Sequence, residues 1–257
     1  MLEGGSYFEG PRWHEGSWWV SDFYRRTVSR VLPSGGEEIV LEVENQPSGL
    51  GWLPDGSLLV VSMKDQRLLR VAADGSVSTH ADLSDVCGGH LNDMVVDATG
   101  RAFVGDFGFD LMGGGAPSSA SVKRVDPDGT VTVVASDLRF PNGSVITPDG
   151  GTLIVGETWG NRYTAFDIAA DGSLTNRRVW ASLGPEPVGN SVEELMTQIV
   201  VAPDGCTLDA EEHIWCADGF GSRLVRVAPD FYEHTRAPVR EAVLVSTQVA
   251  VPHAGLP

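Results

Sequence analysis

A repeated turn-and-strand unit constrains the fold of this chain more than any other feature. A turn followed by a short strand-like run occurs five times along the 257 residues. The runs read SWWVSD, SLLVVS, RAFVGD, GTLIVGE and HIWCAD, and the turns before them lie at residues 14–16, 54–56, 98–100, 148–150 and 210–212. Their β-branched and aromatic content is typical of strands. Their spacing of roughly 40 to 60 residues is that of a four-stranded propeller blade.

A second turn lies inside the repeats, where an Asp-Gly pair separates two strand-like runs. It occurs in RLLRVAADGSVSTHA, SVKRVDPDGTVTVVA and YTAFDIAADGSLTNRRVW. Each unit therefore predicts four short antiparallel strands, and no long pattern with the helical period of 3.6 is present. A β-sandwich is the alternative all-β architecture, but it does not explain a regular repeat. We expect one all-β propeller domain over residues 1–257.

Charge and cysteine content narrow the class of protein. The 35 acidic residues against 18 basic ones leave a net charge of −17, which argues against binding to nucleic acid or an anionic membrane. The three cysteines, Cys87, Cys206 and Cys216, form neither a CxxC pair nor a disulfide framework, so we interpret Cys206 and Cys216 as small core residues. No signal peptide or membrane-spanning run is present. We expect a soluble cytoplasmic protein.

One polar residue recurs at the same place in the first strand of each repeat. The five segments read FEGPRWH, PSGLGWL, LNDMVVD, PNGSVIT and PDGCTLD, and the recurring residues are Glu9, Ser48, Asn92, Asn142 and Asp204. The first strand of a propeller blade lines the central channel, so these side chains should form a ring. Asn-Gly and Asp-Gly pairs can also be ordinary turns, but their register across repeats favours the ring. Oxygen donors suit a hard cation such as Ca²⁺ or Mg²⁺.

These motifs resemble the gluconolactonase, regucalcin (senescence marker protein) and luciferin-regenerating family. The resemblance covers about residues 7–230 and rests on FEGPRW, PSGLGWLPDG, LNDMVVD, GRAFVGDFGFD, FPNGSVITPDG and LDAEEHIWCAD. It implies that Glu9, Asn142 and Asp204 bind one divalent metal ion, and that Asp204 acts as general base or nucleophile. It also implies that Asn92, with Asp93 beside it, lies next to the metal and contacts substrate. Ca²⁺ is the first choice, with Zn²⁺, Mn²⁺ or Mg²⁺ as alternatives.

The resemblance also implies six blades, although only five repeats are visible. After Val245 the family continues with a Gly-Gly turn and an apolar strand, and this sequence has neither. We therefore expect a six-bladed propeller of four-stranded antiparallel blades with an incomplete last blade. That blade is either partial or completed by another chain in a homo-oligomer, unless the sequence itself is damaged.

The expected activity is metal-dependent hydrolysis of a small-molecule lactone or carboxylic ester, with the cation polarising the carbonyl. The alternatives are an organophosphate-hydrolysing propeller and a non-catalytic binding propeller whose metal only holds the blades together. His90 stands where sugar lactonases of the family often carry arginine, which puts a sugar-acid lactone in doubt. Its imidazole either hydrogen-bonds the substrate, less strongly than a guanidinium would, or is a rim histidine of no consequence. Phe107, Phe109 and Trp159 either wall an apolar pocket or pack between blades. Two long loops, 111–119 and 185–195, either cover a site or are tolerated insertions.

Overall fold

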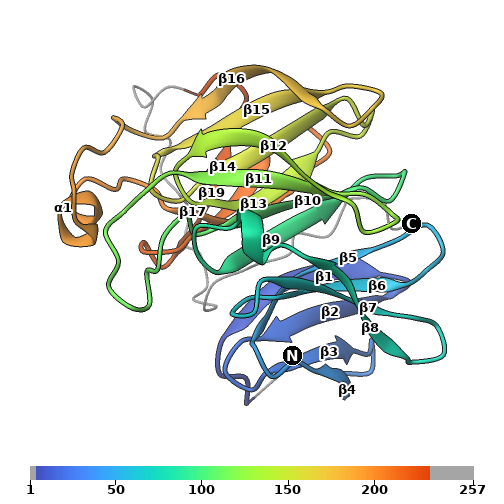
Figure 1. Cartoon of the computed structure of the whole chain (residues 1–257). Coiled ribbons are helices and arrows are strands. Elements are labelled where there is room, and N and C mark those ends of the chain that lie inside the picture. Colours follow the sequence, from blue (N-terminus) through green and yellow to red (C-terminus); the bar gives the residue numbers. More distant parts are fainter. Residues whose placement is uncertain (1–3, 232–257) are drawn as a thin grey trace.

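The computed structural model describes residues 4–231, which form five antiparallel sheets (Figure 1). The first sheet contains β1 (Phe8–His14), β2 (Ser17–Asp22), β3 (Thr27–Val31) and β4 (Glu37–Glu42). The second contains β5 (Pro47–Trp52), β6 (Leu58–Ser62), β7 (Arg67–Val71) and β8 (Val77–Asp82). The third contains β9 (Leu91–Val96), β10 (Ala102–Asp106), β11 (Ala120–Val125) and β12 (Val131–Leu138).

The last two sheets complete the described part of the chain. The fourth contains β13 (Pro141–Ile146), β14 (Thr152–Glu157), β15 (Arg162–Ile168) and β16 (Leu174–Ser182). The fifth contains β17 (Pro203–Leu208), β18 (Ile214–Asp218) and β19 (Arg223–Val227). Two short helices lie in connections: the 3₁₀ turn η1 (Ser84–Val86) and α1 (Val192–Met196).

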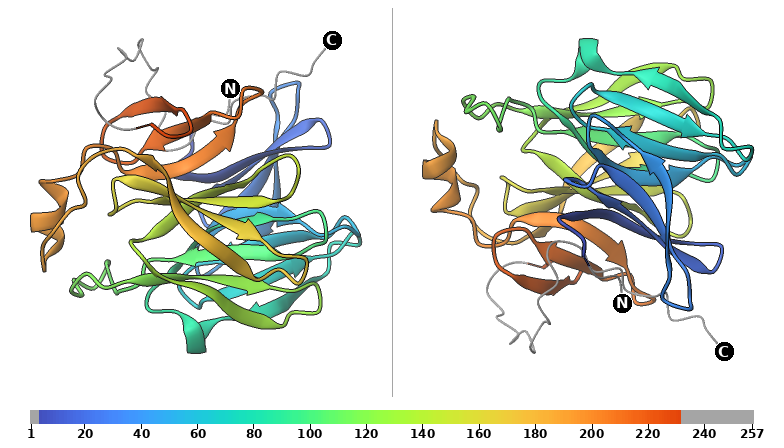
Figure 2. Two further views of the ribbon diagram at one scale, coloured as in Figure 1. Left: turned by 90° about the horizontal axis from the view of Figure 1, so that it is seen from above. Right: turned by 90° about the horizontal axis from the view of Figure 1, so that it is seen from below.

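The sheets are the blades of a β-propeller. The first strands β1, β5, β9, β13 and β17 contact one another in chain order, and the remaining strands of each sheet follow outward (Figure 2). The hydrophobic core lies between neighbouring sheets, as where Val28 of the first meets Leu50 and Val60 of the second. Such face-to-face packing of consecutive four-stranded sheets confirms the predicted all-β propeller.

The predicted number of blades is wrong for the part of the chain that the structure describes. Residues 4–231 form five blades instead of six, and the fifth has three strands within that range. The reason is that this stretch contains five first-strand motifs, and each blade requires one. The segment after Val245 lies outside the described residues, so completion of the last blade by its own chain or another stays a prediction.

A buried carboxylate ends the second strand of four of the five sheets: Asp22, Asp106, Glu157 and Asp218. Each accepts a hydrogen bond, at 2.7 to 3.0 Å, from a backbone N–H in the segment leading into the first strand of its own sheet. Each also pairs with a basic side chain, namely Arg25, Lys123, Arg162 and Arg223 respectively. This repeated contact fixes where each first strand enters, and therefore where its channel residue lies.

Candidate metal centre

Each first strand carries a β-bulge at its channel residue. The pairing register slips between Glu9 and Arg12 in β1, and equivalent slips occur in β5, β9, β13 and β17. A bulge adds one residue to one strand and re-aims the side chains there, which is why bulges are common beside active sites. The glycine that follows four of the five channel residues has a steric reason. A Cβ on Gly143 would lie only 2.2 Å from the Asp204 carbonyl oxygen of the next first strand.

The structure brings Asn142 and Asp204 into direct contact. The Asn142 Nδ2 donates to Asp204 Oδ1 at 2.9 Å and to Thr158 Oγ1 at 3.3 Å. The Thr158 hydroxyl donates in turn to the Pro203 carbonyl at 2.6 Å, so the amide is held from two sides. In this orientation the Asn142 Oδ1 is buried, and no described residue supplies it with a hydrogen-bond donor. A buried acceptor without a donor destabilises the site unless a ligand binds there.

Glu9 reaches the same ring from the first sheet. The side chains of Glu9 and Asp204 are 8% and 7% exposed. Burial, and then the nearby carboxylates of Asp204 and Asp93, raise the pKa of Glu9 well above its usual value, while Arg12 opposes the shift. Two carboxylates this close repel each other unless a positive charge lies between them. Glu9, Asn142 and Asp204 therefore present oxygen atoms suited to a hard divalent cation.

Within residues 4–231, no group of three or more His, Cys, Asp or Glu residues is arranged to hold a metal ion. The predicted set has two carboxylates and one amide, so it lies outside this kind of group, and metal binding by it stays a prediction. Asp93 does not act as a third carboxylate because its Oδ1 accepts from Arg12 at 2.6 Å and from the Met94 N–H at 2.8 Å. That ion pair ties the first sheet to the third.

The predicted substrate-binding residues lie around the ring. Asn92 is buried, and its Nδ2 donates to the Pro141 carbonyl at 3.4 Å, one residue before Asn142. His90 lies 5.7 Å from Phe107 between ring centroids, and burial lowers its pKa, which favours the neutral imidazole. A substrate contact by Asn92, His90 or Asp93 stays a prediction, and Asp93 is occupied by Arg12.

The aromatic residues form a continuous row beside the ring. Phe107 stacks on Phe140 at 4.3 Å, Phe140 meets Trp159 edge to face at 6.2 Å, and Trp159 lies 5.3 Å from Phe220. Phe107 and Trp159 are buried in the main apolar cluster, so they pack between blades. Sequence reasoning missed Phe140, although it immediately precedes the PNG motif.

A cavity of about 380 Å³ lies against this row. Both long loops contribute to it, with residues 117–119 from one and Glu186, Gly189 and Leu195 from the other. Phe109 and Trp159 line the cavity and Phe107 does not. The expectation that these aromatic residues wall a pocket therefore holds for Phe109 and Trp159, and the alternative of packing between blades holds for Phe107. Both loops therefore line this cavity, and a binding role for them stays a prediction.

The cysteines agree with their interpretation as core residues. Cys206 and Cys216 are directly opposite each other in β17 and β18, and both thiols are free. Both pack in the apolar cluster between the fourth and fifth sheets, where burial raises the pKa of Cys216 to about 12. A thiol of that pKa is neither a good nucleophile nor a ready metal ligand at neutral pH.

No helix within residues 4–231 has the length and apolar character that crossing a lipid bilayer requires.

The chain is similar in sequence and in fold to several known proteins. It is 31% identical over 237 residues to the pentonolactonase XacC of Haloferax volcanii, covering 90% of this chain and 73% of that protein. A regucalcin from Agrobacterium tumefaciens superposes with a TM-score of 0.68 at 25% identity, over 86% of this chain and 70% of that one. A gluconolactonase from Xanthomonas campestris superposes with a TM-score of 0.65 at 24% identity, over 89% and 77%.

The model of the family described as the SMP-30/Gluconolactonase/LRE-like region matches residues 8–252, nearly the whole chain. The motifs that suggested this family, from FEGPRW to LDAEEHIWCAD, all lie within the matched range. The chain belongs to the SMP-30, gluconolactonase and luciferin-regenerating-enzyme-like family, whose relatives include named lactonases.

Proposed function

We propose that this protein hydrolyses lactones or carboxylic esters with one divalent metal ion, Ca²⁺ being the first choice, bound by Glu9, Asn142 and Asp204. The observation that carries the proposal is the buried Asn142 Oδ1, which no described residue satisfies, beside two buried carboxylates. The Asn142 amide is oriented by Thr158 and Asp204, as expected of a ligand that is positioned in advance.

The bound ion would polarise the substrate carbonyl and stabilise the negative charge that develops on its oxygen. Asp204 is the candidate general base, taking a proton from the attacking water, or alternatively the nucleophile. Its Oδ1 is held by Asn142 Nδ2 and by the Gly205 N–H at 3.0 Å, which fixes the plane of the carboxylate. The Asn92 amide, which donates to the Pro141 carbonyl, is the candidate group to orient the substrate.

The relatives support the lactone half of the proposal. One, 31% identical to this chain, is named a pentonolactonase, and another curated relative is named a lactonase. A δ-lactone and an aryl ester present the same carbonyl carbon to an attacking water, so both belong in one test.

A substrate panel with Ca²⁺, Mg²⁺, Mn²⁺ or Zn²⁺ added separates the candidate functions. We expect turnover of at least one lactone or aryl ester that exceeds turnover of a paraoxon-like phosphotriester. Faster phosphotriester cleavage would assign the site to organophosphate hydrolysis. An inert panel, together with a metal fully enclosed by protein oxygens, would assign a non-catalytic binding propeller.

Metal binding should also stabilise the fold. The three proposed ligands come from the first, fourth and fifth sheets, so the ion binds the folded chain and not the unfolded one. Free Ca²⁺ at a hundredfold its dissociation constant should then add about 2.7 kcal/mol to the free energy of unfolding. Thermal melts in EDTA and in excess Ca²⁺ measure the difference, and Asn142→Ala is the control that should reduce it. Identical melts, with binding confirmed by calorimetry, would show that the ion does not bridge the sheets.

A further inference from the structure

Two residues that line the cavity, Phe140 and Trp159, lie close in the chain to proposed metal-ligand residues, although none of the proposed ligands lines the cavity itself. Trp159 directly follows Thr158, whose hydroxyl accepts from Asn142 Nδ2. Phe140 lies two residues before Asn142 and contacts Trp159 edge to face. The Trp159 N–H donates to the Arg139 carbonyl at 3.2 Å, so β13 and β14 hold both aromatic walls in place. Phe140 and Trp159 therefore connect the cavity to the strands that carry and support the proposed ligand Asn142.

The floor of the cavity is apolar. It is formed by Phe109, Phe140, Trp159 and Leu195, each buried and packed in one cluster. The volume of about 380 Å³ is within the range of small-molecule sites. One polar atom belongs to this floor, the Trp159 Nε1, which is buried and has no acceptor among the described residues.

The two basic groups at the rim, Arg139 and Arg162, are both paired, and the exposed Asp137 adds a further carboxylate to the lining. Arg139 Nε pairs with Glu186 at 3.2 Å, and Arg162 pairs with Glu157 at 2.8 Å and with Glu186 at 3.3 Å. An anionic substituent would have to displace one of these carboxylates. A polyhydroxylated substituent would find few free donors or acceptors on the floor, and desolvating its hydroxyl groups is unfavourable. The floor therefore favours an uncharged apolar group, while Ser118, Ser119 and Asp137 keep the rim polar.

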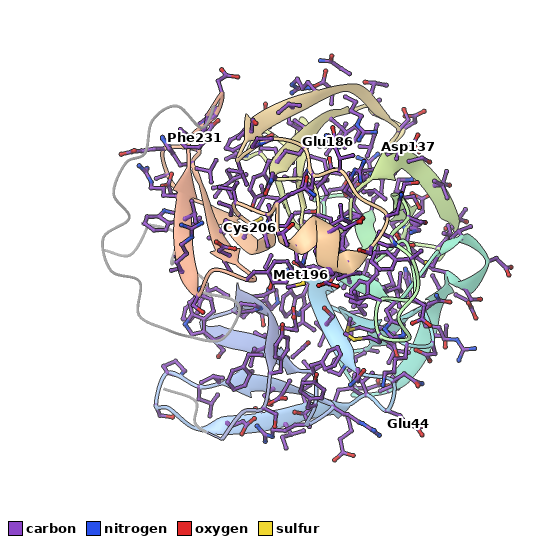
Figure 3. The ribbon with its side chains drawn as sticks, turned by 90° about the vertical axis from the view of Figure 1, so that its left-hand side faces the viewer. Glu44, Asp137, Glu186, Met196, Cys206 and Phe231 are labelled. Atoms are coloured by element: carbon purple, nitrogen blue, oxygen red, sulfur yellow. The ribbon has the colours of Figure 1, made fainter. Side chains whose placement is uncertain are left out.

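The segment that carries Glu186 and Leu195 is held in position by one buried residue. The Asn161 side chain donates to the carbonyls of Pro185 and Gln198, both at 2.9 Å, and accepts from the Val200 N–H at 2.9 Å. It therefore closes the base of the segment that carries α1. Figure 3 looks onto this face, with Glu186 and Met196 of that segment toward the viewer. The cavity is preformed, which reduces the entropy lost on binding.

We infer that this cavity is the specificity pocket and takes an uncharged alkyl or aryl substituent of the lactone, so that substituted apolar lactones are better substrates than sugar lactones. The inference rests on the proposed function.

The test compares kcat/KM of the metal-loaded protein for δ-valerolactone, δ-decalactone and D-glucono-δ-lactone. Each buried methylene contributes about fourfold, so the pentyl arm of δ-decalactone should raise kcat/KM at least about tenfold over δ-valerolactone. Ser119→Phe, at the exposed rim, should fill the cavity and lower that ratio at least about fivefold. Ser76→Phe is the matched control, an exposed serine in a turn of the second sheet.

The possible outcomes distinguish failure of the pocket assignment from failure of the proposed lactonase function. A ratio near one, or faster hydrolysis of glucono-δ-lactone than of δ-decalactone, overturns the pocket and leaves a lactonase. A high ratio that Ser119→Phe leaves unchanged also overturns it, because the arm then binds elsewhere. If none of the three lactones is hydrolysed with metal bound, the proposed function fails and the pocket assignment with it. The ratio in the unmodified protein is decisive even if Ser119→Phe does not fold.

Discussion

Asp204→Asn should lower turnover by about 10² to 10⁴ at saturating metal, because the substitution removes a general base and keeps the shape of the side chain. Metal affinity should fall less, since a neutral carbonyl oxygen still binds Ca²⁺. The variant amide can keep its oxygen toward the Asn142 Nδ2 and the Gly205 N–H, the two donors to Asp204 Oδ1. Initial rates at several metal concentrations, with occupancy measured separately, distinguish lost chemistry from lost metal.

Asn142→Asp is the matched variant for this experiment. It changes the neighbouring ligand by the reverse exchange of amide and carboxylate, and it leaves Asp204 in place to accept a proton. We expect it to retain much more turnover than Asp204→Asn at equal occupancy. Near-parent turnover by Asp204→Asn would mean that Asp204 is only a ligand, and Glu9 would become the first candidate for the base.

Lys123→Met should lower the free energy of unfolding by about 3 to 5 kcal/mol, because it leaves a buried carboxylate without its counter-ion. Lys123 is 0% exposed and Asp106 is 1% exposed, with Nζ and Oδ2 2.7 Å apart. Methionine has a similar length and apolar stem, so the loss reports the charge more than the volume. Urea unfolding in excess Ca²⁺ measures it, since the metal contribution is then the same for both proteins.

The Arg178–Asp167 pair provides the control. Its two charged atoms are equally close, at 2.6 Å, but the side chains are 40% and 46% exposed. An exposed pair of this kind contributes at most about 1 kcal/mol, so Arg178→Met should have little effect. Equal losses from Lys123→Met and Arg178→Met would contradict the role assigned to the buried pair.

The propeller could be predicted because its signals are local. Turn residues and strand runs such as SLLVVS repeat at blade spacing, and each repeat forms a sheet with its own neighbours in sequence. The contact between Asn142 and Asp204 followed from the same reasoning, since equivalent positions of first strands must meet around a channel. The two residues are 62 positions apart and still form a direct hydrogen bond.

What the repeats could not predict depends on contacts between different blades and loops. The bulges are visible only as register slips between paired strands, although the X-Gly pairs mark their positions. Arg12 forms an ion pair with Asp93, which is 81 residues away in the sequence, and no motif predicts that pairing. The cavity requires two loops of unrelated sequence to meet Phe140 and Trp159. The number of blades was taken from the family and not counted from the repeats, which is why it was wrong for the described residues.

The carboxylates that end the second strands could be predicted from the sequence only in part. The quoted runs show their last residues, Asp22, Asp106, Glu157 and Asp218, at equivalent positions. Their role depends on backbone N–H groups of the preceding loop, such as that of Gly88, and the loops differ in length and sequence. A recurrent acidic residue after a strand therefore indicates a structural contact only once the loop is placed.

Hydrolysis of δ-valerolactone followed by pH-stat, first in EDTA and then with Ca²⁺ restored, tests the central claim most directly. Glu9→Gln, which removes a proposed ligand on the first sheet, is assayed beside the parent protein. We expect chelation to abolish turnover in the parent and excess Ca²⁺ to restore it, and we expect Glu9→Gln to need more Ca²⁺ for the same rate. Full turnover in EDTA, after the metal content is shown to be negligible, would contradict a metal-dependent site on the propeller axis.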